Sequence, residues 1–190
     1  QGDYRATVRV LRPAYERRGG AVQTVFLDFD GARVDVGRMG GDGVRELSPL
    51  SAFLERWGLT AADEDAVIAA TVDTVRENLR EDLRRSGVNP GFRVRIRHSG
   101  AHPDTFGQDD VSRVVVGGTI EESGLATVGI AESLDPGNDA GEETAIVHLD
   151  MLSAPAEDTA ASLNRYIEPA SDVVAFVGRA LGNVIAHEIG

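Results

Sequence analysis

The residues at positions 187–190, His-Glu-Ile-Gly, have the types and order that begin a metal-binding motif of the form His-Glu-x-x-His. In such a motif two imidazoles four residues apart lie on one side of a helix and reach the same Zn²⁺. The glutamate beside the first imidazole can take a proton from metal-activated water. His187 and Glu188 fill the first two positions, and the chain stops at Gly190, before the second histidine. We therefore interpret the sequence as a fragment truncated within this motif.

The segment that carries these residues has the pattern of a buried helix. Pro169 and Ser171 mark its start, and apolar residues then recur at helical spacing: Val173, Val174, Val177, Leu181, Val184, Ile185 and Ile189. Glu188 falls within this apolar stripe, and His187 falls at its margin. A carboxylate that faces the interior is costly unless a metal, a partner or a catalytic role accounts for it. The alternative is a frayed helix end with an exposed histidine and glutamate.

Length and composition limit the classes of protein to consider. The chain has 190 residues, 42% of them hydrophobic, which is enough for one substantial core. We expect an N-terminal extension at 1–20 and a single domain at 21–190. No run of about eighteen apolar residues occurs, so we expect no membrane partner. The net charge of −12 argues against nucleic acid, whose phosphates require basic patches.

Two further features of composition bear on chemistry and processing. The chain has no cysteine, which excludes a disulfide framework and thiolate metal ligands. It begins with Gln rather than Met, so we expect that any signal or pro-segment has been removed or was never included.

A sheet and two main helices are the elements expected to position the motif. Hydrophobic alternation predicts strands at about 22–29, 92–97, 114–116, 126–131 and 144–149. The glycine-rich stretch 31–47 is predicted to form turns, with one short strand at 32–36. A short helix at 51–57 would pack Phe53, Leu54 and Trp57. We therefore expect an α/β fold, a twisted mixed β-sheet with two main helices on one face.

The longer of these helices has the clearest boundaries. Thr60 is a cap residue with Asp63 three positions on, and Gly87 closes the helix. One apolar stripe connects them: Ile68, Val72, Val75, Leu79 and Leu83.

This order of elements, followed by Val-Ile-Ala-His-Glu-Ile-Gly at 184–190, resembles the N-terminal subdomain of metzincin-type (zincin) zinc metalloproteases. The resemblance is strongest to secreted bacterial members with a Leu-Asp-Phe-Asp-Gly segment on an early strand, which here occupies 27–31. Segments 114–118 and 129–133, and Asp-Pro-Gly at 135–137, are also similar to that family. The resemblance covers about residues 21–190 and implies a zincin-like N-terminal catalytic subdomain, incomplete at its C-terminus.

The resemblance implies a secreted zinc metalloendopeptidase that acts on peptides or proteins. His187 would be the first zinc ligand and Glu188 the general base. Two further histidine ligands and a methionine-containing turn would follow residue 190, so the fragment alone should neither hold zinc tightly nor cleave peptides. In the family one strand forms the upper rim of the cleft and pairs with the substrate. That role would fall to Ala126, Thr127, Val128, Gly129, Ile130 and Ala131.

Two other functions stay open at this point. A non-catalytic, metalloprotease-like surface or binding module would keep the fold and lack the remaining zinc ligands. Residues 25–31 also match the first motif of haloacid-dehalogenase-like phosphatases, in which Asp28 would attack phosphorus and Asp30 would act as acid and base. The rest of that motif set is missing. In particular, the chain has no lysine to balance the charge of the phosphate.

An acidic loop offers a second metal site. Asp135, Asn138 and Asp139, with Glu142 and Glu143, supply enough oxygen atoms for a structural Ca²⁺. Acidic loops that bind no metal are commoner, so a calcium site and a metal-free loop both stay open for this segment.

The remaining histidines have simpler explanations. His98 and His102 share the spacing of a metal pair, but Gly100 and Pro103 predict a solvated loop there. His148 lies within an apolar strand, where a hydrogen-bonded core histidine is expected. The alternating arginines at 93, 95 and 97 predict one solvated face of a strand.

Overall fold

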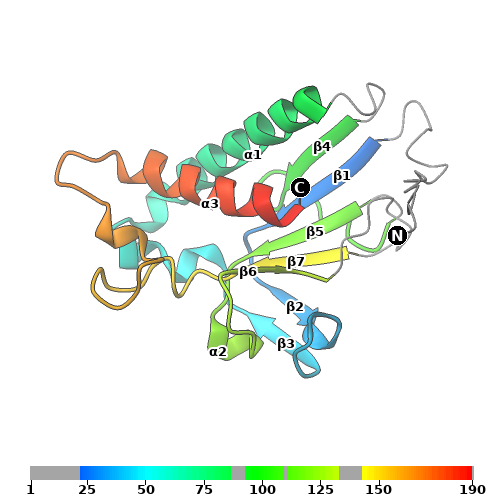
Figure 1. Cartoon of the computed structure of the whole chain (residues 1–190), viewed down its shortest axis with the longest axis horizontal. Coiled ribbons are helices and arrows are strands. Elements are labelled where there is room, and N and C mark those ends of the chain that lie inside the picture. The colour runs from blue at the N-terminus through cyan, green and yellow to red at the C-terminus, as the bar shows by residue number, and fades with distance from the viewer. Residues whose placement is uncertain (1–21, 87–92, 109–110, 133–142, 190) are drawn as a thin grey trace, which may run out of the picture.

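The main sheet has five strands in the order β4-β1-β5-β7-β6 (Figure 1). A computed structural model describes residues 22–86, 93–108, 111–132 and 143–189. The strands are β1 (Val22–Asp28), β4 (Arg93–His98), β5 (Val111–Val116), β6 (Gly129–Ala131) and β7 (Glu143–Val147). The first four strands of that order run parallel, and the edge strand β6 is antiparallel to β7. The predicted mixed sheet is confirmed.

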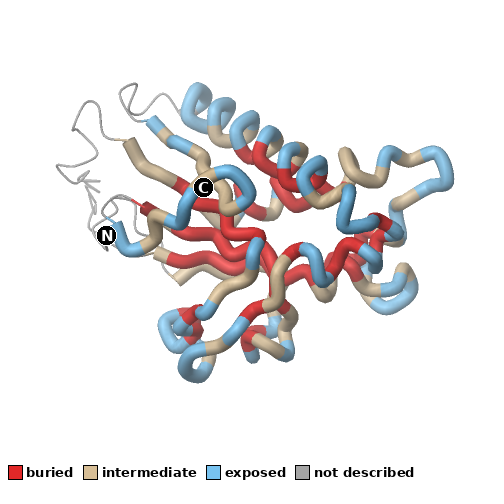
Figure 2. The backbone as a smooth tube through the Cα atoms, turned by 180° about the vertical axis from the view of Figure 1, so that it is seen from behind, coloured by how far each residue is buried: buried red, intermediate tan, exposed pale blue. Residues whose placement is uncertain are grey.

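Two long helices, α1 (Glu64–Ser86) and α3 (Val173–Ile189), lie side by side over one face of the sheet (Figure 1). Alternate strand residues face them, so that Val25, Leu27, Val114 and Val147 share one core with both helices. Figure 2 shows this burial as a continuous buried centre between the sheet and the helices. The predicted α/β fold with two main helices on one face is therefore confirmed.

The start of α1 follows from local sequence. The Thr60 backbone N–H donates to the Asp63 carboxylate at 2.8 Å, and a 3-10 turn at Ala61–Asp63 leads into the helix. The predicted stripe is buried at Ile68, Val72 and Val75. Leu83, near the end of the stripe, is exposed.

Two glycines let α3 approach α1 closely. A Cβ at Gly178 would lie 2.4 Å from the Cβ of Ala70, and one at Gly182 would lie 2.5 Å from the Cβ of Thr74. Larger side chains at these positions would force the helices apart. Near the C-terminal ends, the Asn78 amide donates to Asn183 at 2.9 Å. This hydrogen bond links the C-terminal halves of the two helices.

The cap of α3 differs from the prediction by one residue. Asp172, rather than Ser171, accepts the Ala175 backbone N–H at 3.0 Å and caps the helix. The Ser171 hydroxyl accepts the Glu168 N–H instead, in the preceding turn. The prediction missed this shift because both residue types are good caps.

A small second layer covers the opposite face of the sheet. Strands β2 (Ala32–Asp35) and β3 (Val44–Leu47) form an antiparallel pair beside the short helix α2 (Ile120–Ser123). They enclose a second core that includes Val34, Val36, Leu47, Val115 and Ile146. The prediction of turns at 31–47 missed β3, because Leu47 is its only buried residue and alternation is too weak to detect.

Two other predicted elements differ from the structure. The expected helix at 51–57 is two 3-10 segments, Leu50–Ala52 and Leu54–Trp57, separated at Phe53. Phe53, Leu54 and Trp57 are nevertheless buried, as predicted. The strand expected at 126–131 is paired only over Gly129–Ala131. The remaining 3-10 segments are Val36–Met39 and Leu163–Arg165. None of the helices in the described ranges is long and apolar enough to cross a membrane.

Candidate functional site

The end of α3 brings the two motif residues to the antiparallel edge of the sheet. The helix is buried against the sheet at Val177, Leu181 and Ile185. Glu188 continues this side of the helix, three residues after Ile185, and the structure gives α3 direct contacts with β6. The helix that the sequence predicted for His187 and Glu188 is present through Ile189.

The Glu188 side chain lies against the backbone of Gly129 on β6. A Cβ at Gly129 would lie 2.2 Å from the Glu188 carboxylate Oε1 and 2.6 Å from its Cδ. The carboxylate therefore occupies the space that any other residue at 129 would fill. Glu188 is half-buried there, and burial raises the pKa of its carboxyl, while the neighbouring His187 opposes the rise. A raised pKa makes the carboxylate a stronger base.

His187 leaves the helix in a different direction from Glu188. Its imidazole is exposed and borders a polar hollow of about 280 Å³ between the C-terminal halves of α1 and α3. Asn78, Glu81 and Asp82 line the α1 side of this hollow. The two motif residues thus lie next to each other, with Glu188 against the sheet edge and His187 open to solvent.

Some main-chain groups of the edge strand β6 point away from its partner strand β7. Glu132 N–H donates to Thr144 O at 3.1 Å, and His148 N–H donates to Val128 O at 2.8 Å. In an antiparallel pair hydrogen-bonded positions alternate, so Gly129 and Ala131 direct their N–H and C=O groups away from β7. Only residues 129–131 of the predicted substrate-binding segment form this strand, while 126–128 lead into it.

The described residues do not form a complete metal site. No three His, Cys, Asp or Glu side chains in 22–86, 93–108, 111–132 and 143–189 come close enough together to hold a metal ion. His187 offers one accessible imidazole for Zn²⁺, and the other ligands would have to come from elsewhere. The proposed calcium ligands Asp135, Asn138 and Asp139 lie outside the described residues.

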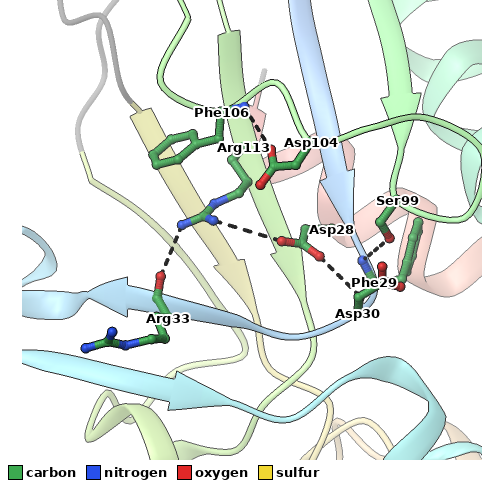
Figure 3. Close-up of polar contacts among 8 residues, drawn as sticks. All are labelled: Asp28, Phe29, Asp30, Arg33, Ser99, Asp104, Phe106 and Arg113. Atoms are coloured by element: carbon green, nitrogen blue, oxygen red, sulfur yellow. Dashed lines mark hydrogen bonds and ion pairs between the residues drawn. The ribbon is translucent and has the colours of Figure 1, made fainter.

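The two aspartates of the phosphatase alternative have different surroundings (Figure 3). Asp28 ends β1 on the face away from the helices and is 6% exposed, whereas Asp30 is exposed. The Asp28 Oδ1 accepts the Asp30 N–H at 3.1 Å, and its Oδ2 lies 4.0 Å from the Arg113 guanidinium. Burial raises the pKa of Asp28, and Arg113 partly offsets this. A buried, ion-paired carboxylate is poorly placed to attack a phosphate.

Arg113 is held on three sides. Its guanidinium lies 4.0 Å from the centre of the Phe106 ring and donates to the Arg33 carbonyl at 3.3 Å (Figure 3). Phe106 is positioned in turn by its N–H, which donates to Asp104 at 2.8 Å. We interpret the Asp28 and Arg113 pair as a structural element of the second core.

His98 is the last residue of β4, and His102 lies in the turn that follows it. The rings of His98 and His102 are 5.3 Å apart and meet edge to face. The Nδ1 atom of His102 lies 3.3 Å from the His98 carbonyl oxygen, so one of its two nitrogens faces backbone. Burial, His102 and Arg76 lower the pKa of His98.

His148 is fully buried one residue beyond β7. Its Nδ1 lies 2.7 Å from the Thr127 carbonyl oxygen, which confirms a core histidine with a hydrogen-bond partner. Sequence reasoning missed its connection to the segment before β6, because the two are 21 residues apart. The only signal was a polar residue within an apolar strand.

Comparison with known proteins leaves the family unidentified. No family model, no curated protein and no solved structure matches this chain.

Proposed function

We propose that this chain is part of a zinc metallopeptidase in which His187 is one zinc ligand and Glu188 is the general base. The observation that carries the proposal is the position of Glu188, half-buried against Gly129 on an edge strand whose main-chain groups at 129 and 131 point away from β7. This arrangement puts a basic carboxylate beside a strand that can hold an extended peptide.

His187 and Glu188 suit different parts of this chemistry. The exposed imidazole of His187 is accessible to a metal ion, and a bound Zn²⁺ would polarise the substrate carbonyl and lower the pKa of water. Glu188 accepts the proton from the attacking water and can deliver it to the leaving amine. Its raised pKa favours both transfers near neutral pH.

The edge strand would orient the substrate. An extended peptide pairs with the outward N–H groups of Gly129 and Ala131 and with the Ala131 C=O, while the Gly129 C=O accepts the Thr127 hydroxyl at 2.8 Å. Because Gly129 also contacts Glu188, a peptide bond held at this position lies beside the general base. Binding and proton transfer therefore use the same residue pair.

We also propose, from the sequence resemblance alone, that the enzyme is bacterial and secreted. A non-catalytic binding module would retain β6 and its outward-pointing main-chain groups but bind no zinc. The phosphatase alternative has less support, because Asp28 is buried and paired with Arg113.

Zinc binding tests the proposal directly. The parent protein, meaning the full-length protein that contains this sequence, should bind one zinc ion per catalytic domain, measured by elemental analysis after gel filtration. His187→Ala should lower affinity for zinc by at least about a hundredfold, because one of a few ligands is lost. His102→Ala, a histidine in a loop elsewhere, should leave zinc content unchanged. A parent without stoichiometric zinc would instead support the binding module.

A further inference from the structure

We propose that His148 is a positioning residue that holds the edge strand β6 in place beside Glu188. This inference rests on the proposed function, because it assigns His148 a role in the same site. It begins from a buried titratable side chain that the proposed proton transfers do not use.

Strand β6 needs anchoring at its ends. It has only three residues and pairs with a single neighbour, β7. A short strand at a sheet edge gains little stability from its own pairing. At its C-terminal end, the Glu132 N–H donates to Thr144 O at 3.1 Å, and the Glu132 carboxylate, which is 11% exposed, lies 3.7 Å from Arg38. The N-terminal end of the strand is anchored separately.

His148 supplies that other anchor through two bonds to consecutive residues. Its backbone N–H donates to Val128 O at 2.8 Å, and its Nδ1 lies 2.7 Å from Thr127 O. The Thr127 hydroxyl then donates to Gly129 O at 2.8 Å. A chain of hydrogen bonds therefore runs from the His148 side chain to the residue that contacts Glu188.

The surroundings of His148 define its hydrogen-bonding state. Thr127 O can only accept, so Nδ1 carries the proton and donates it. The Nε2 atom is buried and has no hydrogen-bond partner among the residues that the structure describes. A neutral imidazole satisfies this arrangement, since a second N–H would be buried without an acceptor. The charged groups that face the ring are Asp150, after β7, and Glu122, on α2.

A pair of substitutions separates the N–H donor from the bulk of the ring. His148→Leu removes the donor, whereas His148→Asn has nearly the same shape as leucine and keeps an amide N–H near the position of Nδ1. The two replacement side chains are equally short, so the difference between the two variants measures the contribution of the hydrogen bond to Thr127.

In the zinc-loaded parent, His148→Leu should raise KM for a fluorogenic peptide about tenfold and change kcat less than about threefold. His148→Asn should restore KM to within about threefold of wild type. Equal KM values for wild type and His148→Leu, or equal losses in both variants, would overturn the proposal.

Amide hydrogen exchange tests the anchor independently of catalysis. In the 190-residue chain, His148→Leu should speed exchange at Ile130 about tenfold, while Leu27 in β1 changes less than about twofold. Equal acceleration at both amides would indicate global destabilisation and contradict a local anchor. An inactive parent with selective exchange at Ile130 would refute the proposed function while leaving the anchor intact.

Discussion

Glu188 occupies the space beside the α-carbon of Gly129, with its Oε1 2.2 Å from where a β-carbon would be. The backbone of Gly129 is not in the left-handed region, so glycine is not required there for conformation. Its missing side chain is explained instead by the carboxylate that packs against it. The helix end and the edge strand are thus fitted to each other at this one contact.

We predict that Gly129→Ala lowers the free energy of unfolding by about 1 kcal/mol, because the new methyl group must displace the flexible end of the Glu188 side chain from its half-buried position. The same substitution should cost less than about 0.5 kcal/mol when Glu188 is already alanine, since the overlap is then absent. Urea unfolding of the four chains of this double-mutant cycle measures the coupling.

Gly100→Ala is the matched control for this cycle. A Cβ at Gly100 would meet its nearest neighbour, the His98 ring, at 3.4 Å, which is ordinary contact. Its unfolding free energy should stay within about 0.5 kcal/mol of wild type. Additive effects of Gly129→Ala and Glu188→Ala would show that the two residues do not interact as described.

The close approach of α1 and α3 gives a second prediction. Alanine at Gly178 should favour an isolated helix by about 1 kcal/mol. Its Cβ would lie 2.4 Å from the Ala70 Cβ and 3.1 Å from backbone atoms of α1, which should cost about 3 kcal/mol. We therefore expect a net loss of about 2 kcal/mol by thermal unfolding. The compensating pair Gly178→Ala with Ala70→Gly should recover part of that loss, and no recovery would argue against this packing.

The buried pair in the second core should depend on its cation. Arg113→Met leaves the Asp28 carboxylate buried without a counter-ion, which should cost about 3 kcal/mol at pH 7. Arg33→Met removes an exposed ion pair with Glu46 and should change stability by less than about 1 kcal/mol.

The pH dependence of the Arg113→Met variant checks its cause. Burial already raises the pKa of Asp28, and loss of the cation raises it further, so the folded state binds the proton more readily than the unfolded state. Stability then falls as pH rises through this window, and the variant should recover stability relative to wild type as pH falls from 7 to about 5. A deficit that does not depend on pH would exclude the buried carboxylate as its source.

His148 should contribute the opposite pH dependence. Burial lowers its pKa, so the unfolded chain binds the proton first as pH falls below about 6.5. The stabilising contribution of the neutral ring is therefore lost with falling pH. The difference in unfolding free energy between wild type and His148→Asn should shrink between pH 7 and 5 in urea titrations. A constant difference would show that His148 does not titrate in this range.

Much of the fold could be predicted because its core elements have strong periodic patterns. The stripe of α3 and the alternation in β1 and β4 identify which residues face the core. Strand β3 and the α3 cap could not be located as well, because one buried leucine or two adjacent cap residues leave the choice open.

The candidate site was less predictable, since its contacts join segments that are distant in sequence. The sequence singled out Glu188 as a carboxylate within an apolar stripe, but Gly129 is 59 residues earlier and was named only within the substrate-binding segment that the resemblance implies. The pairing of Asp28 with Arg113 likewise depends on the register between β1 and β5. Such contacts arise from tertiary packing, which local patterns do not encode.

Peptide hydrolysis by the zinc-loaded parent protein tests the central claim most directly. Wild type should cleave a fluorogenic peptide, and Glu188→Gln should lower kcat at least about a hundredfold while zinc remains bound, because the general base is lost. Glu121→Gln, at an exposed acid on α2, should keep wild-type activity. A zinc-loaded parent that cleaves no peptide, or one that Glu188→Gln leaves fully active, would contradict the assignment.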